Sequence, residues 1–409
     1  MMKKTLAVLL SGAMLAGMTT GAAVTAAADD APTVTVSTWN ELPTDDSLNM
    51  FKQCTEATGI NVEYTVIAES DYSSKLNQMV ATQDNSIDIM IVWENDLGNF
   101  AQVGGIEALD DYLADSTIDT DDMIDAVAKL SDGLGGTYGL PWCAATEIMY
   151  YNKDMFDAAG IEYPTNDWSY EDFLAAAEAL TGDGVYGFEI PSQHTWWAGI
   201  GGAGDEIYDP ATGQMVIGDG AVSFLTDCKS MVDAGIMNEP SSDTTDLFAA
   251  GKAAMTWRGS WQISSYGDSL GFNWDIATIP TNVRKYNTLH TGFYTINANS
   301  ANKDAAWEVI EYLMGEEGQT INSKNSGNMS ALKSIADEGA WKTEAAQNVI
   351  TNWDAMTDSL AAGVFGYTCL PSGVTSDAVS KFESCMLGEM TPEEAVQAAS
   401  DYAAETIGY

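Results

Sequence analysis

The chain places tryptophans directly beside polar residues in segments that are neither apolar helices nor apolar strands. Residues 39–41 read Trp-Asn-Glu and residues 93–96 read Trp-Glu-Asn-Asp, and each run ends a stretch with the pattern of a β-strand. Open α/β sheets place ligand-binding groups just beyond the carboxyl ends of their strands. An indole ring covers an apolar surface, while amide and carboxylate oxygens accept hydrogen bonds. The two runs therefore favour non-covalent ligand binding.

Sequence motifs of catalysis and cofactor binding are missing. The two histidines, His194 and His290, lie about 100 residues apart without a Cys/His cluster, so we predict no metal site. Residues 199–204 match G-x-G-x-x-G, but they follow no strand pattern and precede Asp205 and Glu206, which would repel a phosphate. We therefore expect no cofactor. The 60 acidic residues could still form a pair with the spacing of a glycoside hydrolase, so an enzyme stays an alternative.

The elements that must position these residues begin with alternating strands and helices. Residues 33–39 and 60–67 are rich in β-branched residues, and residues 87–93 are almost wholly apolar, as in strands buried on both faces. Helical patterns lie between them, the first ending at Gly59. This order indicates an α/β fold.

The rest of the chain continues this pattern with longer helices. Capping boxes at residues 169–172 (Ser-Tyr-Glu-Asp) and 391–394 (Thr-Pro-Glu-Glu) predict two helix starts, and residues 304–314 carry an apolar stripe at helical spacing. We assign Trp307, Trp341 and Trp353 to helices and packing rather than to a site.

The N-terminus has the pattern of a secretory signal peptide, assigned to residues 1–28. Lys3 and Lys4 precede an apolar stretch over residues 5–18, and small residues lead to a cleavage site near Ala28. Met18 stands where a bacterial lipobox would need its cysteine, so we expect an unlipidated protein that is secreted, periplasmic or associated with the cell surface. The five cysteines include no C-x-x-C pair, and we expect buried free thiols.

The composition excludes several classes of partner. A net charge of −44, which becomes −46 without Lys3 and Lys4, disfavours nucleic acid and anionic membranes, since both are bound by clustered Lys and Arg. The hydrophobic content of 45% excludes global disorder. We expect a soluble monomer that repels other copies of itself.

Five motifs occur together in the order found in a known family. They are residues 138–142 (Tyr-Gly-Leu-Pro-Trp) with 147–161, residues 251–255 leading to 259–261, residues 292–296, residues 302–307 and residues 391–395. The chain resembles the family 1 extracellular solute-binding proteins of ABC importers, a group that includes maltodextrin-binding protein. The resemblance spans nearly the whole chain after residue 28.

The resemblance implies an α/β fold of two periplasmic-binding-protein-like lobes, joined by short hinge crossings and enclosing a ligand cleft. It places residues 29–140 and 290–335 in lobe 1, and residues 141–289 and 336–409 in lobe 2.

The resemblance also implies a sugar-binding site, in which aromatic rings cover the apolar faces of a pyranose and polar groups bind its hydroxyls. For several residues other roles stay open. Asn40, Glu41, Asn95 and Asp96 could belong to an ordinary turn or helix cap. Trp142 and Tyr367 could serve in packing, and Arg258 could bridge a carboxylate. One of the two adjacent tryptophans is expected to pack while the other faces the cleft. The expected sugar-binding residues are Asn40, Glu41, Asn95, Asp96, Trp142, Glu147, Gln193, His194, Trp196, Trp197, Arg258, Trp261 and Tyr367.

The function implied is capture of a carbohydrate and its delivery to ABC permease subunits by closure of the hinge. A binding protein for a cation such as a polyamine is the alternative, because Glu41, Asp96 and Glu147 near tryptophan rings would suit an ammonium group. A glycoside hydrolase is the third hypothesis.

Overall fold

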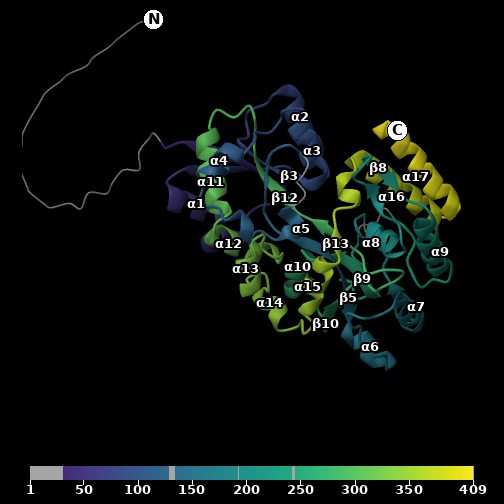
Figure 1. The fold of residues 1–409 in the computed structure, drawn as a ribbon. Coiled ribbons are helices and arrows are strands. Elements are labelled where there is room, and N and C mark those ends of the chain that lie inside the picture. Colours follow the sequence, from purple (N-terminus) through teal and green to yellow (C-terminus); the bar gives the residue numbers. More distant parts are fainter. Residues whose placement is uncertain (1–30, 129–133, 192, 242–244, 409) are drawn as a thin grey trace, which may run out of the picture. The chain divides into compact units, whose positions relative to one another are not determined.

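The computed structural model describes residues 31–128, 134–191, 193–241 and 245–408. The predicted signal peptide lies outside the described residues. Residues 32–409 form one compact unit by themselves, whose ribbon is shown in Figure 1. In the part of the chain that is described, no helix combines the length and apolarity needed to cross a membrane.

Three strands within residues 33–93 build a five-stranded mixed sheet together with strands at residues 140–141 and 292–296. β1 pairs in parallel with β2 and β3, and β12 then pairs antiparallel with both β3 and β4. In spatial order the strands are β2 (Asn61–Val66), β1 (Thr33–Thr38), β3 (Ile89–Trp93), β12 (Gly292–Ile296) and β4 (Leu140–Pro141).

Helices cover both faces of this sheet, as the apolar run at residues 87–93 predicted. Ile89 and Ile91 of β3 pack with helices α1 (Met50–Thr58) and α11 (Lys303–Leu313), whereas the alternate residues Met90 and Val92 pack with α2 (Glu69–Thr82) and α3 (Glu94–Gln102). In Figure 1, α1 and α11 lie on one side of β3 and β12, and α2 and α3 lie on the other. Alternate side chains of a strand point to opposite faces, so both sets are buried.

The second sheet has six strands and is mainly antiparallel. β5 forms its centre, because it pairs with β9, β10 and β11. Its strands are β13 (Gly363–Val364), β11 (Asn287–His290), β5 (Ala145–Asn152), β9 (Ala253–Gly259) and β6 (Tyr186–Phe188), with β10 (Trp274–Ala277) also on β5.

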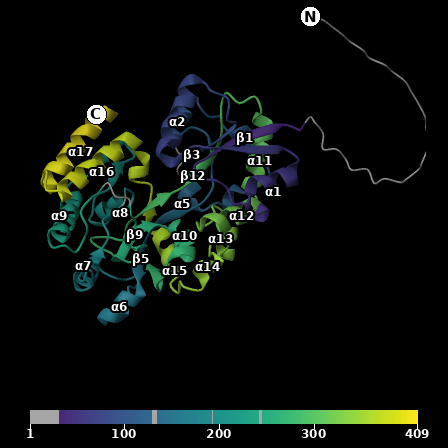
Figure 2. The same cartoon turned by 180° about the vertical axis from the view of Figure 1, so that it is seen from behind.

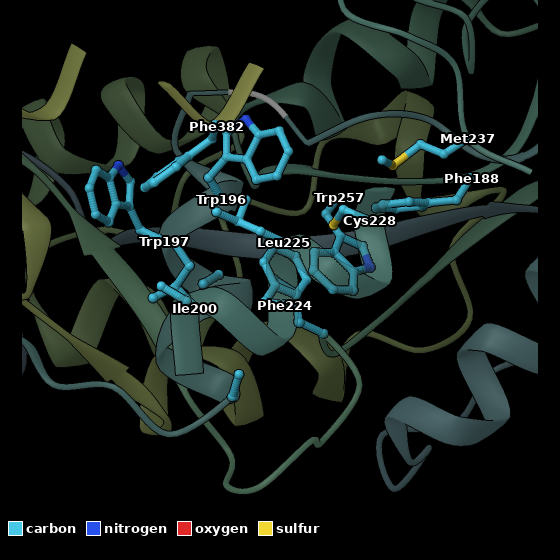
Figure 3. Packing of buried hydrophobic residues seen from close by; sticks show 14 of the residues in the cluster. Phe188, Trp196, Trp197, Ile200, Phe224, Leu225, Cys228, Met237, Trp257 and Phe382 are labelled. Atoms are coloured by element: carbon cyan, nitrogen blue, oxygen red, sulfur yellow. The ribbon is translucent and has the colours of Figure 1, made fainter. Parts of the chain in front are cut away.

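An aromatic core fills one face of the six-stranded sheet. Trp257 of β9 stacks on Phe224 at a ring-centroid distance of 6.1 Å, and Trp196 and Trp197 pack against Phe382 (Figure 3). The helices on this face are α7 (Tyr170–Ala179), α8 (Thr195–Gly202), α9 (Asp219–Asp233), α16 (Ser372–Met386) and α17 (Pro392–Ile407). Figure 2 shows α9, α16 and α17 together at this side of the unit.

The opposite face is covered by shorter helices. Ile148 and Tyr150 of β5 and Leu289 of β11 belong to this second core, which also contains the predicted packing residue Trp341. Its helices are α5 (Asp125–Ala128), α10 (Gln262–Ser269), α14 (Glu344–Gln347) and α15 (Asp354–Ala361).

The remaining elements are short and lie at the edges of the two sheets. They are the hairpin β7 (Ile207–Asp209) and β8 (Gln214–Val216), the helices α4 (Asp110–Ala114), α6 (Lys153–Ala159), α12 (Glu316–Ser326) and α13 (Lys333–Glu338), and the 3₁₀ turns η1 (Asp46–Leu48), η2 (Thr120–Asp122) and η4 (Tyr367–Cys369).

The chain passes between the sheets through very short segments. Three residues, 142–144, separate β4 from β5, and Thr291 alone separates β11 from β12. A segment near residue 329 runs beside the first of these crossings, because Met329 forms a β-bridge with Ala144. The structure thus confirms the two-lobe α/β class with short crossings.

Local predictions were also confirmed. Ser169 and Thr391 form capping boxes, Pro392 opens α17, and Gly59 ends α1 in a left-handed conformation. All five cysteines are free, four of them buried. Residues 199–202 of the G-x-G-x-x-G stretch lie inside helix α8.

Candidate functional site

His290 joins two glutamates at the crossing between the sheets. It is the last residue of β11, and its Nδ1 lies 3.1 Å from Oε1 of Glu94, the first residue of α3. Its Nε2 lies 3.1 Å from Oε1 of Glu147 on β5 and 3.2 Å from the hydroxyl of Thr288. Glu94 follows a strand of the five-stranded sheet, whereas Glu147 belongs to the six-stranded sheet. The imidazole therefore bridges the two sheets.

The charges around His290 keep it protonated at neutral pH. Burial alone would lower the pKa of His290, but hydrogen bonds and charge attraction from Glu147 and Glu94 outweigh burial and raise this pKa to about 9. Glu147 is fully buried, and among the described residues neither of its carboxylate oxygens has a hydrogen-bond partner, since Oε1 only makes the charge contact with His290. Such a carboxylate oxygen is an acceptor available to a ligand hydroxyl or amine.

His194 lies beside His290 but is held neutral. The two imidazole centroids are 5.1 Å apart, and Nδ1 of His194 lies 2.6 Å from the hydroxyl of Tyr367. Burial, and then the charge of His290, lower the pKa of His194. Tyr367 is buried, which raises the pKa of its hydroxyl and keeps it protonated. His194 can therefore offer a ring nitrogen for a neutral hydrogen bond.

Trp261 completes this cluster as its half-buried aromatic member. Its ring lies edge-on to His290 at 5.4 Å and to His194 at 5.8 Å. It stands directly before α10, just after β9 ends at Gly259. The structure thus brings together four of the residues that were predicted from the sequence, namely Glu147, His194, Trp261 and Tyr367.

A second aromatic group lies at the end of the five-stranded sheet. Trp39 lies 5.8 Å from Trp93 and 5.5 Å from Trp142, and all three rings are half-buried. Tyr72 packs behind them and hydrogen-bonds to Ser37 and to the carbonyl of Ile91. These rings form an apolar platform of the kind that can cover a sugar face.

The ring of Trp142 lies in the crossing because residue 292 is a glycine. A Cβ added to Gly292 would lie 2.6 Å from Nε1 of Trp142. The motif at residues 292–296 therefore begins with a glycine because a larger residue there would clash with the ring of Trp142. This position is two residues after His290.

Arg258 occupies the opposite face of the sheet. In the antiparallel register of β5 and β9, Glu147 stands across from Gly259, so the neighbouring Arg258 points to the other face. Its guanidinium pairs with Glu189 at 3.0 Å and Asp246 at 3.7 Å. Of the two roles expected for Arg258, the structure shows the carboxylate bridge.

The four polar residues of lobe 1 have mixed surroundings. Asn40 and Glu41 are exposed, and Glu41 accepts a hydrogen bond of 3.2 Å from Tyr64. Asn95 is half-buried, whereas Asp96 is buried and accepts hydrogen bonds from Ser73 and Asn77 of α2. Asp96 therefore fastens α3 to α2.

The tryptophan pair of α8 differs from the expectation that one ring would face the cleft. Trp196 and Trp197 are both fully buried, because every residue of α8 is surrounded by other elements. Trp197 stacks on Tyr367 at 5.4 Å and so supports the site from behind. Gln193, two residues before α8, is exposed, and its side-chain amide lies 3.4 Å from the hydroxyl of Ser376.

Sequence reasoning missed Glu94 and His290 as site residues. Glu94 directly follows the strand that ends at Trp93, so its position after a strand could have identified it. The prediction instead selected Asn95 and Asp96 from the same run. His290 precedes the motif at residues 292–296, at an expected lobe boundary. Trp39 and Trp93 were noted only as neighbours of polar residues.

The cluster around His290 offers hydrogen-bond acceptors, one cation and aromatic rings to a ligand. Within the described ranges, no group of three or more His, Cys, Asp or Glu could hold a metal ion. A cavity of about 300 Å³ lies elsewhere, against α11 and α13, and none of the predicted site residues line it.

Comparison with known proteins yields a family match and similar structures. The model of the family described as "Bacterial extracellular solute-binding protein" matches residues 49–368. An ABC substrate-binding protein from Listeria monocytogenes in complex with cycloalternan superposes with a TM-score of 0.82 at 25% identity, covering 93% of this chain and 100% of that one.

Two similar sequences have names that state a ligand. The erythritol/L-threitol-binding protein of Mycolicibacterium smegmatis is 25% identical over 319 residues, which are 66% of this chain and 63% of that protein. The diacetylchitobiose-binding protein of Streptomyces coelicolor is 23% identical over 371 residues, which are 86% of this chain and 81% of that protein.

Proposed function

Because this chain belongs to the bacterial extracellular solute-binding proteins, we propose that it captures a sugar or oligosaccharide for an ABC importer. The ligand would lie between the aromatic platform of Trp39, Trp93 and Trp142 and the cluster of Glu147, His194 and Trp261. The relatives support this class of ligand, because two are named for erythritol/L-threitol and diacetylchitobiose.

The observation that carries the proposal is the convergence of both sheets on Glu147. Among the described residues, neither oxygen of this buried carboxylate has a hydrogen-bond partner, and half-buried Trp261 lies in the same cluster. A buried acceptor without a partner costs free energy, so a ligand hydroxyl that fills it contributes to affinity. An adjacent indole covers the apolar face of a ring.

The two sheets would act as two lobes that close on the ligand. We propose lobe boundaries at residues 29–140 with 290–335 and 141–289 with 336–409. The strand membership of the sheets supports these boundaries to within one residue, whereas helix α5 packs on the six-stranded sheet. Ligand contacts made only in the closed state would favour closure, and ABC permease subunits would receive that state. Secretion with cleavage near Ala28, a monomeric state and binding without catalysis belong to the same proposal.

Calorimetric titration with erythritol, diacetylchitobiose and maltotriose tests the proposal. At least one is expected to bind with micromolar affinity, about −8 kcal/mol. Trp261→Ala should weaken this binding roughly tenfold, or about 1.4 kcal/mol, through loss of ring stacking. Trp353→Ala is the control, because Trp353 is also half-buried but packs beside Trp341, away from the cluster.

Two results would contradict the proposal. One is the absence of binding to every sugar and polyol at neutral pH. The other is an equal loss of affinity in the Trp261 and Trp353 variants, which would indicate general destabilisation rather than a lost contact.

A cation such as a polyamine is the second candidate ligand, favoured by the two carboxylates Glu94 and Glu147 around one histidine. Binding of spermidine that weakens steeply between about 10 and 150 mM salt would support this candidate, because salt screens charge attraction. A neutral sugar should bind almost equally at both salt concentrations.

A further inference from the structure

We infer that His290 is a positioning residue for ligand binding: its protonated imidazole holds Glu94 and Glu147 across the crossing between the two sheets, and loss of that proton lowers ligand affinity. The inference rests on the proposed function, because it concerns the same site. It adds a dependence on pH that neither the family nor the composition implies.

The geometry favours a protonated ring. Each nitrogen of His290 lies 3.1 Å from a different carboxylate oxygen, Nδ1 in a hydrogen bond with Glu94 and Nε2 in a charge contact with Glu147, so a proton on both nitrogens makes both contacts favourable. Only the imidazolium has two N–H donors, because a neutral ring has one donor and one lone pair. Without the proton, one glutamate would face a lone pair, and two carboxylates would repel each other at a buried position.

The position of His290 makes the bridge an inter-sheet contact. Only Thr291 separates it from β12 of the five-stranded sheet. The Thr291 hydroxyl donates to the carbonyl of Cys143 in the neighbouring crossing at 2.7 Å. The two crossing segments are therefore hydrogen-bonded to each other beside the ion pairs of His290. A displacement of Glu94 or Glu147 would thus move groups that belong to both sheets.

The titratable groups facing His290 come from four elements. They are Glu94 of α3, Glu147 of β5, His194 before α8 and Tyr367 of η4. His194 is neutral and Tyr367 stays protonated, so the two glutamates provide the charge. Cys143 and Cys369 lie in the field of Glu94, and burial raises the pKa of both thiols.

The other elements packed on β11 contribute no charge to this face. β13 (Gly363–Val364) pairs with β11 and has no ionisable side chain. Helices α5 and α15 pack on the opposite side, where Leu289 lies with Val127, Met356 and Leu360. The protonation of His290 is thus governed by the pair of glutamates, which agrees with a pKa raised to about 9.

The link to the ligand passes through Glu147. Its Oε1 lies 3.1 Å from Nε2 of His290 without a hydrogen bond, and its Oε2 is a buried acceptor that has no partner among the described residues. A ligand hydroxyl donating to Oε2 needs this carboxylate held in place, which the contact with His290 provides. His290 would therefore act on the ligand through Glu147.

The test measures affinity against pH. Maltotriose, or diacetylchitobiose if maltotriose does not bind, is titrated calorimetrically at pH 7.5, 8.5, 9.5 and 10. If only the protonated form binds well, one pH unit above a pKa of about 9 leaves about one tenth of the molecules competent, so affinity should fall roughly tenfold by pH 10.

Three variants separate the role of His290 from a general effect of pH. His290→Gln should bind roughly tenfold more weakly at pH 7.5 and show no further loss up to pH 10. His194→Gln, which alters the other histidine, should keep the wild-type shape of the profile. Glu94→Gln removes one of the two charges and should move the loss of affinity to lower pH.

Nuclear magnetic resonance gives a readout that needs no ligand. The chain has two histidines, so their ring signals can be assigned with the two glutamine variants. The His290 signal should titrate near pH 9 and the His194 signal below its ordinary range.

Distinct outcomes overturn the two proposals. Failure of all sugars and polyols to bind at pH 7.5 overturns the proposed function and the role of His290 with it. Binding that is equally tight at pH 7.5 and 10, or a wild-type pH profile in His290→Gln, overturns the role of His290 alone.

Discussion

The ion pairs of His290 link its protonation to folding as well as to binding. The side chain is 9% exposed, and its contacts with Glu94 and Glu147 exist only in the folded chain. In an unfolded chain a histidine has a pKa near its ordinary value of 6.5. Because folding raises this pKa, the folded state binds the proton more tightly than the unfolded state does.

The free energy of unfolding should therefore depend on pH in a defined window. The contribution of His290 is fully present below about pH 6.5 and is lost as the pH rises to about 9, with a size of about 3 kcal/mol. Urea denaturation of the wild type and His290→Gln at pH 6.5 and 9.5 measures it. The difference in stability between the two proteins should shrink at pH 9.5, and a constant difference would show that the charge plays no part.

The two helix starts that were predicted from capping boxes in the sequence are found in the structure. Ser169 accepts a hydrogen bond from the amide of Asp172, whose side chain accepts one from the amide of Ser169. Thr391 and Glu394 form the same pair at the start of α17. These boxes depend on residues three apart in the chain, so the sequence alone was sufficient to predict them.

Removing either cap should destabilise the protein moderately. Ser169→Ala and Thr391→Ala are each expected to cost about 1 kcal/mol, because amide groups of the first turn lose their acceptor. Thermal unfolding followed by circular dichroism should show a decrease of a few degrees. Ser223→Ala is the matched control, since Ser223 is an exposed residue inside α9, and a similar decrease there would argue against the caps.

The surplus of acidic residues acts over the whole protein. The chain has 60 acidic and 16 basic residues, so most carboxylates have no basic partner. Many of the ion pairs that form are exposed, such as Lys285 with Asp167 and Lys333 with Asp125. Exposed pairs contribute little to stability, and repulsion among like charges opposes the compact state.

Screening by salt should therefore stabilise the fold. Raising sodium chloride from about 10 to 150 mM shortens the screening length from about 30 to 8 Å, which weakens the repulsion. The melting temperature at pH 7 should rise by several degrees, and potassium chloride should give the same rise. A lower melting temperature in salt would mean that the ion pairs outweigh the repulsion.

The sequence by itself determined the elements, the α/β class and several members of the site. Strand alternation, apolar runs and caps act between near neighbours, so β1, β3 and the capped helices could be read from residues 33–39, 87–93, 169–172 and 391–394. The resemblance selected Glu147, His194, Trp261 and Tyr367, which the structure brings together.

Only the tertiary structure decided which polar groups meet. His290 and Glu94 are 196 residues apart, and their contact depends on β11 and α3 converging at a crossing. The register of β5 with β9 turned Arg258 to the opposite face, and the burial of α8 enclosed both Trp196 and Trp197. Pairing between distant segments sets these outcomes, and a shift of one residue in the register of β5 with β9 would turn Arg258 to the face of Glu147.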